Sequence, residues 1–225
     1  MTHKWLYLLI AAVLLAGCTP VNQTTTELPD DVSSATLERY RESEITEYLG
    51  ARLDPAVGPR DNSINGVQQV DIDTYTLTID GLVDAETVLT YSDVTALEPD
   101  TRLITLYCVE GWDATILWKG VRLTELIDMA SAQPEAVTVI FSSTDGYTTS
   151  LPYETVKEKQ LILAYSANGL DLPPEMGYPF IVVAEEKLGY KWARWVNRIT
   201  LSSNAGYQGY WEQFGYSNEA DLPVE

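Results

Sequence analysis

The chain has 225 residues and a formal net charge of −19 at neutral pH, which argues against nucleic acid or an anionic membrane surface as a partner. Its only histidine is His3, so the rest of the chain has no Ser-His-Asp triad, Cys-His pair or histidine-rich metal site. The two cysteines, Cys18 and Cys108, are therefore the first candidates for a chemical role.

The first residues predict export. Lys4 precedes an apolar run over residues 5–16 that is short for a membrane span. The run closes on LAGC (residues 15–18), which resembles a lipobox, the motif whose cysteine is acylated and becomes the mature N-terminus. We therefore expect residues 1–17 to be a signal peptide, and Cys18 to be the lipidation site of an extracytoplasmic protein anchored to the cell membrane. An ordinary signal peptide with a chance cysteine is the alternative.

Two segments separate this signal from the main domain. Residues 18–34 are polar, threonine-rich and acidic, which is typical of a flexible tether behind a lipid anchor. Residues 35–58 predict an N-terminal helix and a linker. Ser34 is a candidate cap for a helix over residues 35–49, and the glycine, proline and asparagine residues that follow argue against regular structure.

The remaining residues, 59–225, predict one domain. Their helices and strands mix without a regular βαβ rhythm, which favours the α+β class. Alternating apolar residues predict strands, and helical spacing predicts short helices. The expected strands are residues 73–81, 101–109, 136–143, 178–185 and 194–201, and the expected helices are residues 122–130 and 152–159.

Cys108 stands at the end of a predicted strand, in LYCVEGW (residues 106–112). If Cys18 is acylated, Cys108 has no partner for an intramolecular disulfide. It is then a buried structural residue, an intermolecular bridge or a thiol with a chemical use. A side chain at a strand end is well placed to point into a crevice, and a thiolate is a ligand for soft metals.

Four bases stand close together near the end of the domain: Lys187, Lys191, Arg194 and Arg198. In so acidic a chain this clustering suggests an anion site, in which the arginine binds a phosphate with two parallel hydrogen bonds. The alternative is that the neighbouring acids at residues 185–186 pair with these bases on a solvated hairpin.

Four segments, in order, resemble the oxidoreductase molybdopterin-binding domain, the family of sulfite oxidase and of the catalytic subunit of the periplasmic methionine-sulfoxide reductase. CVEGW alone is a weak signal, whereas four segments in family order are fairly specific. The segments are RDNSINGVQQVDIDTYTLTIDGLV (residues 60–83), LYCVEGW followed by WKGVRLTELI (118–127), LGYKWARWVNRI (188–199) and GYWEQFGYSNEADLP (209–223).

The resemblance implies a single α+β domain over residues 59–225 with the mixed-sheet sulfite-oxidase fold, and a molybdenum–molybdopterin cofactor. Cys108 would be the metal ligand and the catalytic residue. The implied cofactor-binding residues are Arg60, Asn62, Cys108, Ser143, Lys191, Trp192, Ala193 and Arg194.

The implied function is the transfer of an oxygen atom to or from a small substrate. The chain has no second redox motif, so we expect a separate electron partner, such as a membrane haem or quinone-linked protein. Met176 and Ile181 stand where the family often has a polar residue and a phosphate-binding arginine; Arg198 or Arg60 would have to compensate. This departure supports an alternative, a cofactor-free surface lipoprotein that kept the fold to bind a ligand or partner. In that case Cys108 would pack among aliphatic side chains.

Overall fold

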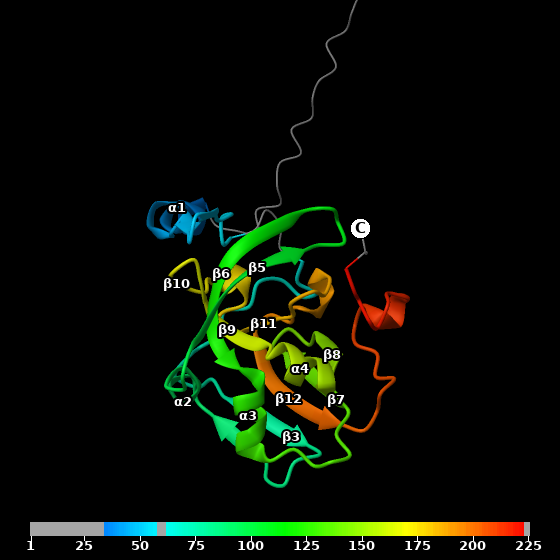
Figure 1. Ribbon diagram of the computed structural model, residues 1–225. Helices are drawn as coiled ribbons and strands as arrows, with labels where there is room; N and C mark the ends of the chain where they lie inside the picture. Colours follow the sequence, from blue (N-terminus) through cyan, green and yellow to red (C-terminus); the bar gives the residue numbers. More distant parts are fainter. Residues whose placement is uncertain (1–33, 58–61, 223–225) are drawn as a thin grey trace, which may run out of the picture.

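The computed structural model describes residues 34–57 and 62–222 (Figure 1). Two five-stranded sheets and several short helices form a single α+β domain, as the sequence predicts. Within the described ranges, no helix is both long and apolar enough to cross a membrane.

The first sheet is built around β9, a strand whose side chains are all buried. The strand order is β10-β9-β6-β5, and β11 also pairs with β9; every pairing is antiparallel. Strands β5 and β6 form a hairpin whose turn contains Cys108. The bounds are β5 Asp100–Tyr107, β6 Asp113–Arg122, β9 Ile162–Ala167, β10 Leu170–Asp171 and β11 Ile181–Val183.

The second sheet has the order β4-β3-β12-β7-β8, with β3 and β12 parallel and the other pairs antiparallel. Val196 at the start of β12 pairs with Ser143 at the end of β7. The segment entering β12 and the β7–β8 loop therefore meet at one end of this sheet. The bounds are β3 Leu77–Gly81, β4 Thr87–Leu89, β7 Thr138–Ser143, β8 Thr148–Pro152 and β12 Val196–Ser202.

The helices are short and lie between or beside the strands (Figure 1). The predicted helices at 122–130 and 152–159 are confirmed as α3 and α4. The bounds are α1 Ser34–Ser43, α2 Tyr91–Thr95, α3 Leu123–Ala130 and α4 Tyr153–Lys159, with 3₁₀ turns η1 Pro174–Met176, η2 Gly189–Lys191 and η3 Glu212–Phe214.

The predicted helix over residues 35–49 is too long. It ends at Ser43, and the next residues form a small hairpin of β1 (Glu47–Tyr48) and β2 (Ala51–Arg52). Leu49 and Gly50 both have positive φ, at 49° and 81°. Positive φ at both central residues is the geometry of a tight hairpin turn, which a helix cannot continue through.

The predicted strand at 73–81 is also shorter than expected, because the chain turns before β3. The N–H of Thr74 donates to the Asp71 carbonyl at 3.3 Å, and the N–H of Asp73 donates to the Asp71 side chain at 3.1 Å. Such a local aspartate-centred turn competes with strand formation.

Two tryptophans in the core pack the first sheet against the segment that precedes β12. Trp118 on β6 is fully buried, and its ring lies 5.6 Å from that of Trp192, centroid to centroid. Its indole N–H donates to the carbonyl of Ile104 on β5 at 3.2 Å. Large buried aromatic pairs of this kind contribute both burial and ring–ring contact, so they fix residues 189–195 against the first sheet.

Candidate molybdopterin site

Cys108 occupies the first position of the β5–β6 turn. Its N–H donates to the Trp112 carbonyl at 2.9 Å, and its carbonyl accepts from the Gly111 N–H at 3.1 Å. Gly111 has a φ of +86°, which a residue with a Cβ atom rarely adopts. The hairpin therefore holds the cysteine backbone firmly at the end of the sheet.

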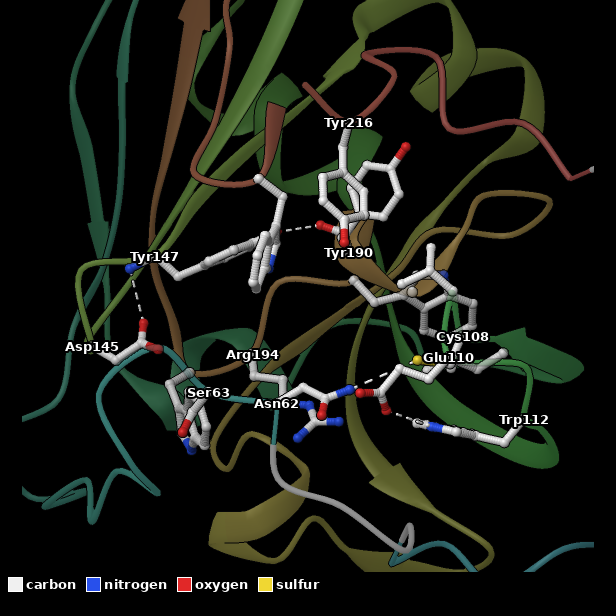
Figure 2. A pocket seen from close by; sticks show the side chains of 16 residues that line it. Asn62, Ser63, Cys108, Glu110, Trp112, Asp145, Tyr147, Tyr190, Arg194 and Tyr216 are labelled. Atoms are coloured by element: carbon white, nitrogen blue, oxygen red, sulfur yellow. Dashed lines mark hydrogen bonds between the residues drawn. The ribbon is translucent and has the colours of Figure 1, made fainter. Parts of the chain in front are cut away.

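The Cys108 side chain faces a cavity of about 310 Å³ and is half-buried (Figure 2). It is the only cysteine in the described part of the chain. The cavity lies between the β5–β6 turn, residues 189–195, the β7–β8 loop and the C-terminal segment. Its lining residues are Asn62, Ser63, Leu106, Cys108, Val109, Glu110, Trp112, Asp145, Tyr147, Gly189, Tyr190, Trp192, Arg194, Trp195, Trp211 and Tyr216.

Polar groups surround the thiol. The Asn62 side-chain amide donates to Cys108 Sγ at 3.7 Å, and the Trp112 indole N–H donates to the Glu110 carboxylate at 3.2 Å (Figure 2). Burial is the largest influence on Cys108 and raises the pKa of its thiol. The backbone N–H of Glu110, the charge of Arg194 and the Asn62 amide act in the opposite direction, because each favours the thiolate.

Arg194 is held at the cavity by the 3₁₀ turn η1. Its guanidinium donates to the Glu175 carbonyl at 3.0 Å, and the neighbouring Trp195 indole donates to the Pro174 carbonyl at 2.7 Å. Gly177, with φ of +101°, lies directly against it: an added Cβ would stand 2.8 Å from the Arg194 Cβ. Gly177, at which the chain keeps the family pattern, therefore supports a cavity residue from behind.

The side chains of Lys191 and Ala193 do not line the cavity. Lys191 is fully buried, and its ammonium donates to the Glu212 carboxylate at 2.5 Å and to the Ser150 carbonyl at 3.0 Å. Ala193 is buried too, and its N–H donates to the Lys191 carbonyl at 3.2 Å. Of the segment predicted to contact the cofactor, the structure brings Trp192 and Arg194 to the cavity.

The predicted anion site made of four bases does not form. Acids from other elements pair with three of the bases, and only Arg194 among the four lines the cavity. Arg198 therefore does not replace the phosphate-binding arginine that the family often has at the position of Ile181. The alternative pairing with residues 185–186 is wrong as well. The observed ion pairs are Lys187–Asp221, Lys191–Glu212, Arg198–Asp80, Arg102–Glu185 and Lys159–Glu186.

Ser143 lies at the end of β7, two residues before Asp145 of the cavity wall. Its side-chain oxygen is buried and has no hydrogen-bond partner among the described residues. Ser143 does not itself line the cavity, so the structure does not bring this predicted residue into contact with it. Arg60 and Cys18 lie outside the described residues.

The sequence did not single out most of the aromatic wall. Tyr147, Tyr190, Trp211 and Tyr216 all line the cavity, and Tyr190 and Tyr216 pack with ring centroids 5.2 Å apart. Aromatic residues suit a protein core as well as a flat ligand. The available signal was the dense run of aromatic residues from 207 to 216, in a stretch too rich in turn residues to form a core strand.

Comparisons with known proteins decide the family. Residues 64–211 match the model of the oxidoreductase molybdopterin binding domain. The chain belongs to this family. It is therefore a molybdopterin-binding oxidoreductase, and the resemblance read from its four segments is confirmed.

The proteins similar to the chain include the following two relatives and one solved structure. The uncharacterized oxidoreductase YuiH of Bacillus subtilis is 32% identical, over 67% of this chain and 76% of the relative. The putative protein-methionine-sulfoxide reductase subunit YedZ1 of Azospira oryzae is 32% identical, over 67% of this chain and 57% of that protein. The sulfane dehydrogenase SoxCD of Paracoccus pantotrophus shares the fold, with a TM-score of 0.61, 21% identity, and coverage of 82% of this chain and 56% of the other.

The described residues fit the cofactor of this family. Among them, no group of three His, Cys, Asp or Glu side chains could hold a metal, so a metal beside Cys108 would take its further ligands from the group that carries it. The Cys108 thiol and the Arg194 guanidinium, both on the cavity wall, are complementary to a metal and a phosphate, respectively.

Proposed function

We propose that this protein is an extracytoplasmic, lipid-anchored oxidoreductase that transfers an oxygen atom to or from a small substrate. The observation that carries the proposal is the Cys108 thiol, held on the wall of a cavity within reach of the Asn62 amide. Molybdopterin, when bound, supplies a molybdenum that cycles between Mo(VI) and Mo(IV) and exchanges an oxygen atom with the substrate.

The chain's own residues would bind the cofactor and orient it. Cys108 would bind the metal as a thiolate, and the Asn62 amide would hold that sulfur in place. Arg194 would bind the phosphate of the pterin, since η1 fixes its guanidinium at the cavity. The aromatic wall would exclude water from the bound group.

The net reaction balances in either direction. In the reductive direction, a sulfoxide, two protons and two electrons give a sulfide and water. In the oxidative direction, a reduced substrate and water give the oxidised product, two protons and two electrons. A methionine-sulfoxide reductase subunit among the relatives supports the reductive direction. The electrons would pass to or from a separate partner, such as a membrane haem or quinone-linked protein.

The proposed location rests on the sequence LAGC at residues 15–18. Acylation of Cys18 would place the domain outside the cytoplasm on a short tether. Labelling with a radioactive fatty acid and separating membranes from soluble material would test this. We expect label and membrane association in the wild type and neither in Cys18→Ala. An unlabelled wild-type protein would contradict the anchor.

The activity is tested with the purified holoenzyme. One assay supplies dimethyl sulfoxide and a reduced viologen dye, and the other supplies sulfite and ferricyanide. We expect turnover in at least one assay, and none with Cys108→Ser. Holoenzyme that contains molybdenum and turns over in neither assay would contradict the proposed oxygen-atom transfer. Cys108 faces a polar and aromatic cavity, which argues against the cofactor-free alternative; Met176 and Ile181 remain the residues that favour it.

A further inference from the structure

One wall of the cavity differs from the others in how it is attached. Residues 211–219, here named the C-terminal loop, supply Trp211 and Tyr216 to the cavity. Within this loop only one side chain is buried, and it is the carboxylate of Glu212, at 2% exposure. Phe214, by contrast, is 68% exposed. A loop with so little apolar burial belongs to the least stable parts of a fold.

The two ends of the C-terminal loop are tied to the domain through its backbone. The N–H of Tyr210, just before the loop, donates to the Thr148 carbonyl on β8 at 2.8 Å. The carbonyl of Ala220, just after it, accepts from the Leu188 N–H at 2.8 Å. The loop can therefore move between two fixed ends without disturbing either sheet.

Glu212 fastens the middle of the loop. Its carboxylate accepts from the Lys191 ammonium at 2.5 Å and from the Thr149 hydroxyl at 2.8 Å. Lys191 has no exposed side-chain surface and also donates to the side-chain oxygen of Asn218, in the same loop, at 3.3 Å. Lys191 belongs to η2, which carries Tyr190 of the adjacent wall. The ion pair thus links two neighbouring walls of one cavity.

We propose that Glu212 is a positioning residue of the molybdopterin site: through its buried ion pair with Lys191 it holds Trp211 and Tyr216 in place as the wall that retains the cofactor. The inference rests on the cofactor of the proposed function and is independent of the substrate. The cavity is partly open to solvent, so the C-terminal loop would act by covering the bound cofactor and slowing its release. The Tyr190 hydroxyl also donates to the Ser217 carbonyl of this loop at 2.8 Å, and loss of the buried ion pair would loosen the loop around that contact.

A buried ion pair suits this task better than an apolar contact. Each charge is strongly disfavoured in the interior without its partner, so the closed position is sharply defined. The second carboxylate oxygen of Glu212 is buried and has no hydrogen-bond partner among the described residues. The loop is thus fastened by a few charge-assisted hydrogen bonds, and a small chemical change at Glu212 should loosen it.

The test compares Glu212→Gln with Glu219→Gln, the same chemical change at an exposed position of the same loop. Holoprotein is diluted into cofactor-free buffer well below its unfolding temperature. The release of cofactor is followed as pterin fluorescence and as the molybdenum retained per chain. We expect release to be on the order of tenfold faster for Glu212→Gln, because hydrogen bonds between charged groups are lost, and unchanged for Glu219→Gln.

Hydrogen exchange separates positioning from general destabilisation. We expect Glu212→Gln to speed exchange in residues 211–219 and to leave exchange in β6 and β9 unchanged. Equal release from both glutamine variants, or faster exchange throughout the sheets, would overturn the inference.

A second pair of variants covers the case in which Glu212→Gln does not fold. Trp211→Ala removes a wall residue without touching the ion pair, and Phe214→Ala removes an exposed ring of the same loop. Faster release from Trp211→Ala alone supports the inference; the same rate in both variants overturns it. Failure of cofactor binding itself would appear differently, as no molybdenum in any protein, wild type included.

Discussion

The two walls that face each other across the cavity are built on different physical principles. The β5–β6 hairpin holds Cys108 through a sheet pairing and buried apolar packing, with Trp118 beneath it. The C-terminal loop holds Trp211 through one buried ion pair and a few hydrogen bonds. On the account proposed above, the metal ligand would stand on the more stable of the two walls, and the wall that retains the cofactor on the less stable one.

The largest change in the free energy of unfolding is expected from a substitution in the β5–β6 hairpin. Trp118→Ala removes a fully buried indole from β6 and its contact with Trp192. Truncation of a buried aromatic residue typically costs about 3–5 kcal/mol. Urea unfolding of the cofactor-free protein should show a loss of this size. A loss below about 1 kcal/mol would mean that the hairpin is not the anchor described here.

A smaller change in the free energy of unfolding is expected from a substitution at Gly177, which packs against Arg194. Gly177→Ala places a Cβ atom 2.8 Å from the Arg194 Cβ at a φ of +101°, and we expect a cost of about 1–3 kcal/mol. Because Arg194 must shift, the variant should also bind less molybdenum than the wild type. Full molybdenum content with unchanged stability would show that η1 does not position this arginine.

Alkaline pH should destabilise the domain as a whole. Burial is the largest influence on Tyr40, Tyr91 and Tyr190 and raises the pKa of each to about 12; it also raises the pKa of Tyr75 and Tyr147. A phenol in the unfolded chain ionises near pH 10. The raised pKa values therefore contribute stability that is complete below about pH 10 and is lost as the pH rises through the folded values.

The measurement is the urea midpoint at about pH 8 and about pH 11. It should fall between these values, and the fall should be smaller in Tyr75→Phe, which removes the ionisable group of a buried ring. A midpoint that does not change over this range would contradict the burial of these phenols.

The smallest change in the free energy of unfolding is expected from a substitution on the exposed face of the C-terminal loop. Phe214→Ser exchanges a ring that is 68% exposed, and such surface changes usually stay within about 0.5 kcal/mol. Urea unfolding should confirm this, whereas a loss above about 2 kcal/mol would indicate that the loop is anchored by apolar burial and not by Glu212.

The sequence predicted the elements whose pattern is local. Strand β5 and helix α3 were found because apolar residues recur at strand and helix spacing. Strands β6 and β9 were missed, since β9 is buried on both faces and shows no alternation. The helix at 35–49 was overextended because its glutamates and leucines favour helix locally, whereas the Leu49–Gly50 turn decides the structure.

The site was predicted only in part, for a similar reason. Cys108 stood out as the single cysteine of the domain, and Asn62 followed from the family resemblance; the structure brings them together. The role of Lys191 depends on Glu212, which is distant along the chain and next to it in space. A cluster of bases in the sequence indicates charge, and only the fold shows which acids neutralise it.

The measurement that tests the account most directly is the molybdenum content of the full-length protein, purified from a host that makes the cofactor. The wild type is compared with Cys108→Ser and with Val137→Ser, a change at an exposed residue that does not line the cavity. We predict close to one molybdenum per chain in the wild type and in Val137→Ser, and almost none in Cys108→Ser. Full molybdenum content in a folded Cys108→Ser protein would contradict the assignment of this thiol as the metal ligand.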